Sequence, residues 1–178
     1  MVVRRVPERG QNFIVRPDKL QTKPVPFYSF NLDVDMPPQA VAERLKSIVG
    51  QTPGFLESMS WRRRDPGGPA FIGTVSDSSF RMRRDIQYRN SFLPLIRGRF
   101  GAIGTGTWVS VTMFIHPLVA LFVLFWLGMA LTFAVSGQTV SPVGWGFFAF
   151  GIALTAGGFF PEAMKARRLI SEALLRRH

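Results

Sequence analysis

The side chains that most often carry out chemistry are scarce in this sequence. Its 178 residues include no cysteine and two histidines, His116 and His178. Nucleophilic catalysis needs a nucleophile beside a base, and a metal site needs several His, Cys, Asp or Glu ligands close together. Asp33 and Asp35 are spaced to share one face of a strand, yet a strand end and a helix cap account for both. The sequence therefore predicts no catalytic residue, no metal site and a protein that is not an enzyme.

A glycine-rich segment also falls short of a nucleotide-binding site. The segment 101–106 (GAIGTG) lacks the Lys and the following helical pattern of a phosphate-binding loop. The chain is strongly basic, with a formal net charge of +11, but no recognised nucleic-acid-binding motif accompanies the charge. We therefore expect neither a small-molecule substrate nor nucleic acid among its partners.

His116 is the one residue whose type and position suit a cofactor ligand. Imidazole ligates haem iron or chlorophyll magnesium, and a histidine in a membrane segment is a functional candidate. Its position directly before Pro117, at the start of an apolar segment, equally suits a residue that hydrogen-bonds to lipid headgroups or to backbone. Both interpretations stay open. We expect no intrinsic cofactor, and only peripheral contact with lipid, pigment or quinone tails.

A long uncharged stretch indicates where the protein resides. The 62 residues between Arg99 and Glu162 contain no Asp, Glu, Lys or Arg. A helix that crosses hydrocarbon about 30 Å thick needs roughly 20 apolar residues. The segments 117–135 and 143–160 each just meet this length, and a short polar turn, 136–142, joins them. The sequence therefore predicts a transmembrane helical hairpin over residues 117–160.

The distribution of positive charge predicts how this hairpin is oriented. Of the 22 Lys and Arg residues, 17 precede the first span, five follow the second and none lies in the turn. Cytoplasmic segments next to membrane spans carry an excess of Lys and Arg. We therefore expect two spans in the bacterial inner membrane with both termini in the cytoplasm.

Residues 27–115 have the periodicity of a small cytosolic α+β domain. Apolar residues alternate with polar ones from Tyr28 to Val34, which predicts a strand, and a one-sided apolar pattern before Gly50 predicts an amphipathic helix. Further strands are predicted at 71–75, 80–86, 91–100 and 107–115, and we expect them to form an antiparallel sheet. An alternative is one helix over 107–135, but Pro117 would disturb it.

Two basic segments flank these units. Residues 1–26 hold six basic and two acidic side chains without a sustained period, which is typical of a disordered arm or of an extended arm that lies along a partner. Residues 161–178 predict a basic amphipathic helix at the cytoplasmic interface, with lipid as the first partner and a protein groove as the competitor. Its apolar face consists of Ala166, Leu169, Ile170, Ala173 and Leu174.

Basic side chains near the predicted membrane surface are the strongest functional clue. A Lys or Arg close to an anionic leaflet gains about 1 kcal/mol, and Arg also forms two-pronged pairs with the carboxylates of a neighbouring subunit. We predict contact with anionic lipid or a partner subunit at Arg4, Arg5, Arg9, Arg62, Arg63, Arg64, Arg97, Arg99, Lys165, Arg167 and Arg168.

Small residues recur along both predicted spans. Small residues four positions apart let helix backbones approach closely, either within the hairpin or against another subunit. The predicted packing positions are Gly128, Thr132, Gly146, Ala149, Ala153 and Gly157.

Two segments of the chain, 71–100 (FIGTVSDSSFRMRRDIQYRNSFLPLIRGRF) and 106–126 (GTWVSVTMFIHPLVALFVLFW), carry a likeness that extends over roughly 27–172. In these residues the chain resembles a family of uncharacterised bacterial membrane proteins that have a small cytosolic domain followed by two C-terminal transmembrane helices. The matching positions are Phe71, Gly73, Phe80, Arg83, Tyr88, Arg89, Asn90, Pro94, Gly98 and Thr107. The resemblance implies the architecture and brings no activity.

Together these features predict a non-catalytic structural or accessory subunit of a larger bacterial membrane complex. The aromatic residues on both spans favour an energy-transducing setting, such as a photosynthetic reaction centre with its light-harvesting ring. The alternative is a free-standing, membrane-anchored cytoplasmic module that binds anionic lipid or a soluble partner.

Overall fold

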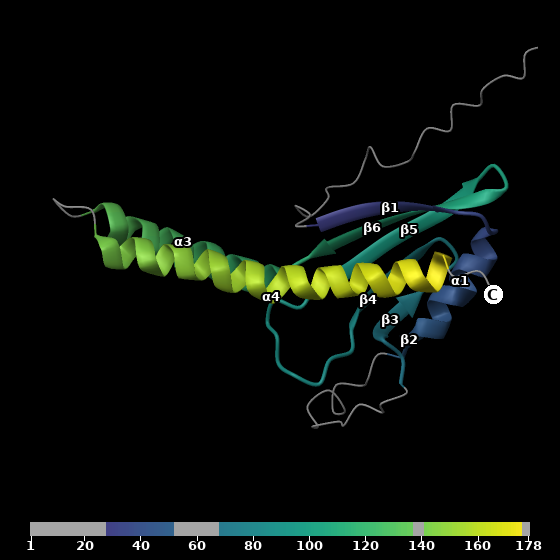
Figure 1. The fold of residues 1–178 in the computed structure, drawn as a ribbon, viewed down its shortest axis with the longest axis horizontal. Coiled ribbons are helices and arrows are strands. Elements are labelled where there is room, and N and C mark those ends of the chain that lie inside the picture. The colour runs from purple at the N-terminus through teal and green to yellow at the C-terminus, as the bar shows by residue number, and fades with distance from the viewer. Residues whose placement is uncertain (1–27, 52–67, 137–140, 176–178) are drawn as a thin grey trace, which may run out of the picture.

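A computed structural model describes residues 28–51, 68–136 and 141–175 of the chain (Figure 1). These residues form an α+β fold in which one mixed sheet is covered on one face by helices. Two of the helices extend together away from the sheet as a long hairpin (Figure 1). The α+β class is therefore as predicted.

Six strands make up the sheet in the described residues, in the order β1-β6-β5-β4-β3-β2. Their bounds are Tyr28–Val34 (β1), Val49–Gly50 (β2), Phe71–Val75 (β3), Ser79–Arg84 (β4), Leu95–Ile103 (β5) and Gly106–Phe114 (β6). All neighbours pair antiparallel except β2 and β3, which are parallel. The prediction of a wholly antiparallel sheet is wrong at this edge, because the short β2 directly follows a helix and carries no alternation of its own.

Two strand predictions differ from the structure in instructive ways. The segment 91–100 was expected to be a strand, but β5 begins at Leu95 because the chain first turns at Asn90, whose Oδ1 accepts a hydrogen bond of 2.9 Å from the Phe92 amide. The alternative of one helix over 107–135 is excluded, since β6 occupies 106–114 and the helix begins only at Pro117.

The strand period of two gives the sheet one apolar face and one polar face. The apolar face contributes Phe71, Phe80, Met82, Ile96, Phe100, Val109, Val111 and Met113, all at most 4% exposed. Gly98 is required on this face, because a Cβ there would lie 2.0 Å from the Phe80 ring. The opposite face is not covered by any described helix, and we call it the open face.

Helix α1, Pro38–Ile48, covers part of the apolar face. Pro37 and Pro38 start it, since proline suits the first helical turn, and Val41 and Leu45 are fully buried against the sheet. At its other end Arg44 donates hydrogen bonds of 3.3–3.5 Å to the carbonyl oxygens of Leu174 and Ala173. These bonds satisfy carbonyls at the end of the last helix, which have no partner inside their own helix.

The hairpin consists of α3, Pro117–Val135, and the first half of α4, Pro142–Leu175. Both helices are long and apolar enough to cross a membrane, and each contains an 18-residue apolar window, with a mean hydropathy of 2.5 in α3 and 1.6 in α4. Backbones meet closely at Gly144, where a Cβ would lie 2.5 Å from the Cα of Ala134. Ser141 directly precedes α4, and its Oγ accepts a hydrogen bond of 3.3 Å from the Gly144 amide.

Helix α4 does not end where the apolar stretch ends. A span over 143–160 and a separate amphipathic tail after Pro161 were predicted, but one helix of 34 residues runs through Pro161 to Leu175. Its second half lies on the sheet, where Ala166, Ile170 and Leu174 are fully buried. The face expected to contact lipid is therefore a core face of the domain, and burial of each large side chain stabilises it by roughly 1.5–3 kcal/mol.

Candidate functional site

The most unusual side chain in the described fold is a buried carboxylate at the junction of hairpin and domain. Glu162 is the first charged residue after the apolar stretch and is only 3% exposed. It lies on α4 directly after Pro161, where the helix passes from the hairpin onto the sheet. A buried charge is costly unless it is paired and hydrogen-bonded, so its partners decide what this position does.

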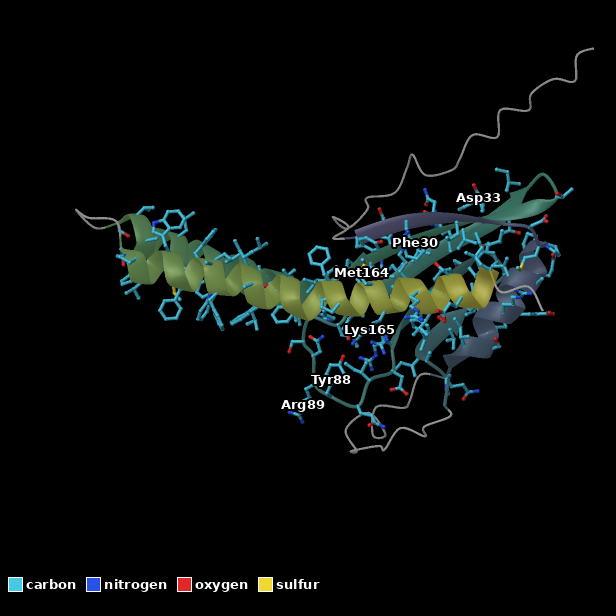
Figure 2. All side chains as sticks on the ribbon, in the orientation of Figure 1. Phe30, Asp33, Tyr88, Arg89, Met164 and Lys165 are labelled. Atoms are coloured by element: carbon cyan, nitrogen blue, oxygen red, sulfur yellow. The ribbon has the colours of Figure 1, made fainter. Side chains whose placement is uncertain are left out.

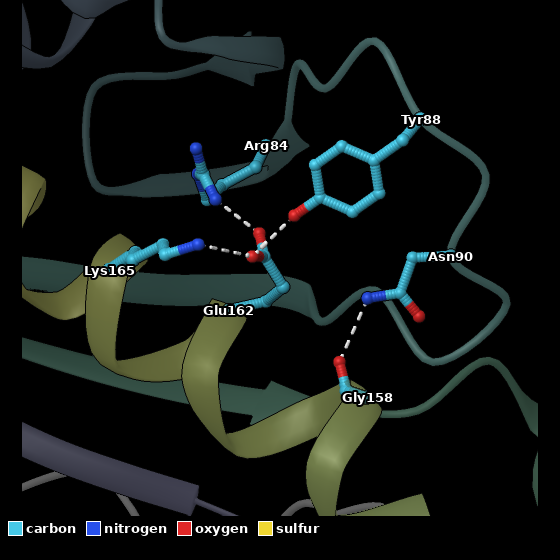
Figure 3. A network of polar contacts seen from close by, with 6 residues as sticks. All are labelled: Arg84, Tyr88, Asn90, Gly158, Glu162 and Lys165. Atoms are coloured by element: carbon cyan, nitrogen blue, oxygen red, sulfur yellow. Dashed lines mark hydrogen bonds and ion pairs between the residues drawn. The ribbon is translucent and has the colours of Figure 1, made fainter. Parts of the chain in front are cut away.

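Three side chains from two segments converge on Glu162 (Figure 3). Arg84, at the end of β4, forms an ion pair through its Nη1 with Oε2 of Glu162. Tyr88, in the loop after β4, donates a hydrogen bond of 2.6 Å to Oε1, and Lys165 reaches the same oxygen at 3.1 Å from the next turn of α4. We call these four residues the junction network.

The junction network holds Glu162 in its charged form. Burial by itself raises the pKa of a carboxyl group, but the hydrogen bonds from Tyr88 and Lys165 and the positive charge of Arg84 together outweigh it. The pKa of Glu162 therefore lies below its ordinary value. The pKa of the Tyr88 phenol is raised, chiefly because its hydrogen bond to the Glu162 carboxylate requires the phenolic proton.

The loop between β4 and β5 makes further contacts with α4. Asn90 donates a hydrogen bond of 2.8 Å from Nδ2 to the carbonyl oxygen of Gly158, one turn before Glu162 (Figure 3). Phe92 packs over Gly158, where a Cβ would approach its ring to 2.7 Å. Figure 2 shows Tyr88 and Lys165 on the same side of α4, with Phe30 on the other side. The network and the loop therefore clamp the helix to the sheet at the base of the hairpin.

A second contact joins α4 to the outer strand of the sheet. Arg167 donates a hydrogen bond of 2.6 Å to the hydroxyl of Tyr28, and its guanidinium lies 5.5 Å from the ring centroid of Phe30. Such cation–π contacts add to the hydrogen bond. Arg167, predicted to contact lipid or a partner, thus has an internal role in holding α4 against β1.

The remaining predicted contact residues are spread over different surfaces. Lys165 belongs to the junction network, and Arg168 pairs with Glu172 at 2.8 Å on the exposed side of α4. Arg97 and Arg99 lie on the open face of β5. The other members of the set lie outside the described residues: Arg4, Arg5, Arg9, Arg62, Arg63 and Arg64.

The predicted helix-packing residues do not form the contact between α3 and α4. Thr132, Gly146, Ala149, Ala153 and Gly157 are exposed, as is Gly128. A Cβ at any of the three glycines would have no neighbour within 4 Å. The contact instead uses another set of small residues: Ala130, Ala134, Gly144 and Gly151. The predicted positions therefore do not pack within the hairpin, and their packing against another subunit stays a prediction.

His116 has a local structural role in the described chain. It precedes α3, and its Nδ1 accepts a hydrogen bond of 3.3 Å from the Leu118 amide. The imidazole therefore caps a helix start whose first amides lack partners inside the helix. Its other ring nitrogen stays open to a ligand, so the cofactor interpretation remains a prediction.

Sequence reasoning used Glu162 only as the end of the uncharged stretch and missed its role. Its partners Arg84 and Tyr88 lie 78 and 74 residues away, so no local spacing links them. One signal was present: Glu162 is an acidic residue on the apolar side of a helix that otherwise turns its basic residues outward. Among the described residues, no three His, Asp or Glu side chains gather as a metal site requires.

The chain was compared with protein-family models, with curated proteins and with solved structures, and none of the three comparisons finds a match. The resemblance to bacterial proteins with two C-terminal membrane helices therefore stays a prediction.

Proposed function

We propose that this protein is a non-catalytic accessory subunit of a bacterial membrane complex, in which a hairpin anchor holds a small cytoplasmic domain in a fixed orientation. The observation that carries the proposal is the continuity of α4. One helix begins in the apolar hairpin and ends in the core of the α+β domain, and the junction network clamps it at the boundary. An anchor connected by a loose linker would need none of these contacts.

The surface of the hairpin supports a membrane location. Only 11% of the apolar window in α3 and 17% of that in α4 is buried. A core helix of a water-soluble protein would be mostly buried, whereas Leu118, Leu124 and Phe125 are each at least 66% exposed. Side chains of this kind are stable in hydrocarbon, or against another apolar surface, and not in water.

The partners are other membrane subunits and anionic lipid. The outer surface of the hairpin is rich in aromatic side chains, with Phe122, Phe125, Phe133, Phe147 and Phe150 at 49–66% exposure. Rings of this kind suit packing against a second subunit or against pigment and quinone tails. An energy-transducing complex, such as a photosynthetic reaction centre with its light-harvesting ring, is the setting we favour.

Purification in mild detergent tests this proposal. The full chain is expected to migrate in a particle much larger than a monomer or homodimer, together with the same partner subunits in repeated preparations. Absorbance of pigment or haem in that particle would identify the setting. A lone monomer or homodimer would instead support the free-standing module, for which the exposed arginines of the open face are the favouring observation.

The orientation has its own experiment. A reporter domain inserted after Ser136, between α3 and α4, is expected to be reached only from the non-cytoplasmic side, because the basic segments keep both termini in the cytoplasm. A reporter at the same site that stayed cytoplasmic would contradict the two-span topology.

A further inference from the structure

The open face of the sheet carries a cluster of positive charge near the base of the hairpin. Arg81 on β4 stands directly opposite Arg97 on β5, and Arg83 follows two residues along β4. All three are exposed. Like charges placed opposite each other destabilise a sheet unless an anion compensates them. Arg81 and Arg83 make no ion pair with any described residue, and the one acidic side chain on the open face of the described strands is the distant Asp33.

This cluster surrounds a shallow hollow of about 250 Å³ with apolar side chains on its hairpin side. Leu95 and Phe114 are paired in register, and Arg83 pairs with Leu95 from the other side. The guanidinium of Arg97 lies 4.8 Å from the ring centroid of Phe114, which is nearer the hairpin than Arg97 itself. Arg97 is therefore directed toward the end of the sheet at which α3 begins.

The height of the cluster above the hairpin matches a lipid headgroup. Phe114 lies three residues before Pro117, and Thr112, which pairs with Arg97, lies five residues before it. At roughly 3.3 Å per residue, the row of Arg83 is at most about 10 Å from the start of α3 and the row of Arg81 and Arg97 at most about 17 Å. Headgroups extend about 5–8 Å beyond the hydrocarbon on each side, and a long Arg side chain spans the remaining gap. Strands β5 and β6 extend from the base of the hairpin in the direction away from it, so this row is at the end of the sheet nearest the anchor (Figure 1).

We propose that Arg81, Arg83 and Arg97 bind the phosphate of an anionic phospholipid whose glycerol and upper acyl carbons lie along Leu95 and Phe114. Guanidinium groups bind phosphate oxygens in pairs, and the apolar residues lie on the side from which the acyl chains arrive. This assignment depends on the proposed membrane anchor. It identifies one class of lipid, the anionic phospholipids, as a bound partner of the domain.

Binding of short-chain lipids to the full chain in a non-ionic detergent tests the site without requiring the hairpin to cross a bilayer. Dihexanoyl phosphatidylglycerol is expected to bind, and dihexanoyl phosphatidylcholine at the same concentration is expected to bind at least tenfold more weakly, as measured by native mass spectrometry. The double variant Arg83→Gln and Arg97→Gln should weaken phosphatidylglycerol binding at least tenfold. Equal binding of the two lipids would overturn the proposal.

The single variant Arg83→Gln is compared with a matched control, since each removes one positive charge. The control is Arg168→Gln, on the exposed side of α4 and across the domain from the open face. Its binding should stay within twofold of the original protein, and an equal loss would show diffuse attraction and overturn the site. The double variant Arg83→Lys and Arg97→Lys keeps the charge and the packing but loses the two parallel N–H donors with which each guanidinium binds a pair of phosphate oxygens. It should weaken binding severalfold. An unchanged affinity would contradict guanidinium recognition.

Competition separates the lipid from other anions. Inorganic phosphate or a Glu-rich peptide, each at the lipid concentration, should displace little phosphatidylglycerol. Full displacement by either competitor would overturn the proposal and show that the site binds a free anion or an acidic protein segment instead of the lipid. If the lipid site is wrong, the protein should still co-purify with partner subunits. If the accessory-subunit proposal is wrong, the protein should still bind phosphatidylglycerol in detergent.

Discussion

Glu162 and Arg84 form an ion pair across 78 residues of sequence and join the base of the hairpin to the end of β4. Their side chains are only 4% and 14% exposed. A pair at this depth is costly to break from one side, because the remaining charge stays buried. This relationship makes the junction a mechanical connection between the apolar hairpin and the sheet, and it gives the first prediction.

Glu162→Gln is expected to lower the free energy of unfolding of the domain by about 3 kcal/mol, because Arg84 is left without its counter-charge. Denaturation by urea in mild detergent, followed by circular dichroism, measures the change. Arg168→Gln breaks an exposed, solvent-screened pair and should cost much less. Replacing both partners with apolar residues, Arg84→Met and Glu162→Leu, should recover much of the loss. Equal effects of the two Gln variants would contradict a special role for the junction network.

The stability of the domain should also depend on pH through Glu162. Its folded-state pKa lies below the ordinary value of 4.5, so the folded state binds this proton less tightly than the unfolded state does. The stabilisation is therefore fully present above about pH 4.5 and is lost as pH falls through the folded-state pKa. Melting curves between pH 7 and pH 3 should show a steeper acid loss for the original protein than for Glu162→Gln. Parallel curves would mean that the carboxylate contributes nothing.

Tyr88 offers a spectroscopic view of the same network. Its pKa is raised above 10.0 by the hydrogen bond to Glu162, so its phenolate should form only at a pH above the ordinary range. The stabilisation from this proton is present below pH 10.0 and is lost as pH rises through the folded-state pKa. Absorbance at about 295 nm follows the titration, and Tyr28→Phe removes the other tyrosine. Glu162→Gln should return the Tyr88 titration toward its ordinary value, and an unchanged midpoint would exclude this cause.

Two glycines two residues apart on α4 should respond oppositely to alanine. Gly144→Ala places a methyl group 2.5 Å from the backbone of Ala134, so α3 and α4 must separate, and the melting temperature should fall by roughly 5 °C. Gly146→Ala meets no atom within 4 Å and should leave the melting temperature unchanged or slightly raise it, since alanine favours helix. A larger loss at Gly146 would place the close contact on the predicted small-residue face.

Continuity of α4 predicts a fixed angle between hairpin and domain. The chain has no cysteine, so spin labels at Leu121→Cys and Asp33→Cys would be unique. Pulsed electron resonance should give one narrow distance distribution, and insertion of Gly-Gly-Ser after Phe160 should broaden it. The same insertion placed after Ser136, in the connection between the two hairpin helices, is the control and should leave the distribution narrow. A broad distribution in the unmodified chain would contradict the clamp.

Local patterns in the sequence predicted most of the secondary structure because they depend on neighbours along the chain. Alternation over 28–34 and 107–115 defined β1 and β6, and the apolar run 117–135 coincides with α3. Scarcity of ligating side chains and the uncharged stretch likewise follow from composition. None of these signals depends on which segments meet in space.

Only the tertiary structure decided what each face contacts. Helical spacing showed that Ala166, Ile170 and Leu174 form an apolar face, but burial against lipid and burial against a sheet require the same spacing. The structure assigned that face to the sheet, selected Gly144 over Gly146 for the hairpin contact, and brought Arg84 to Glu162. Each of these results depends on segments far apart in sequence, whose meeting is fixed by strand order and by the packing of α4 as one helix.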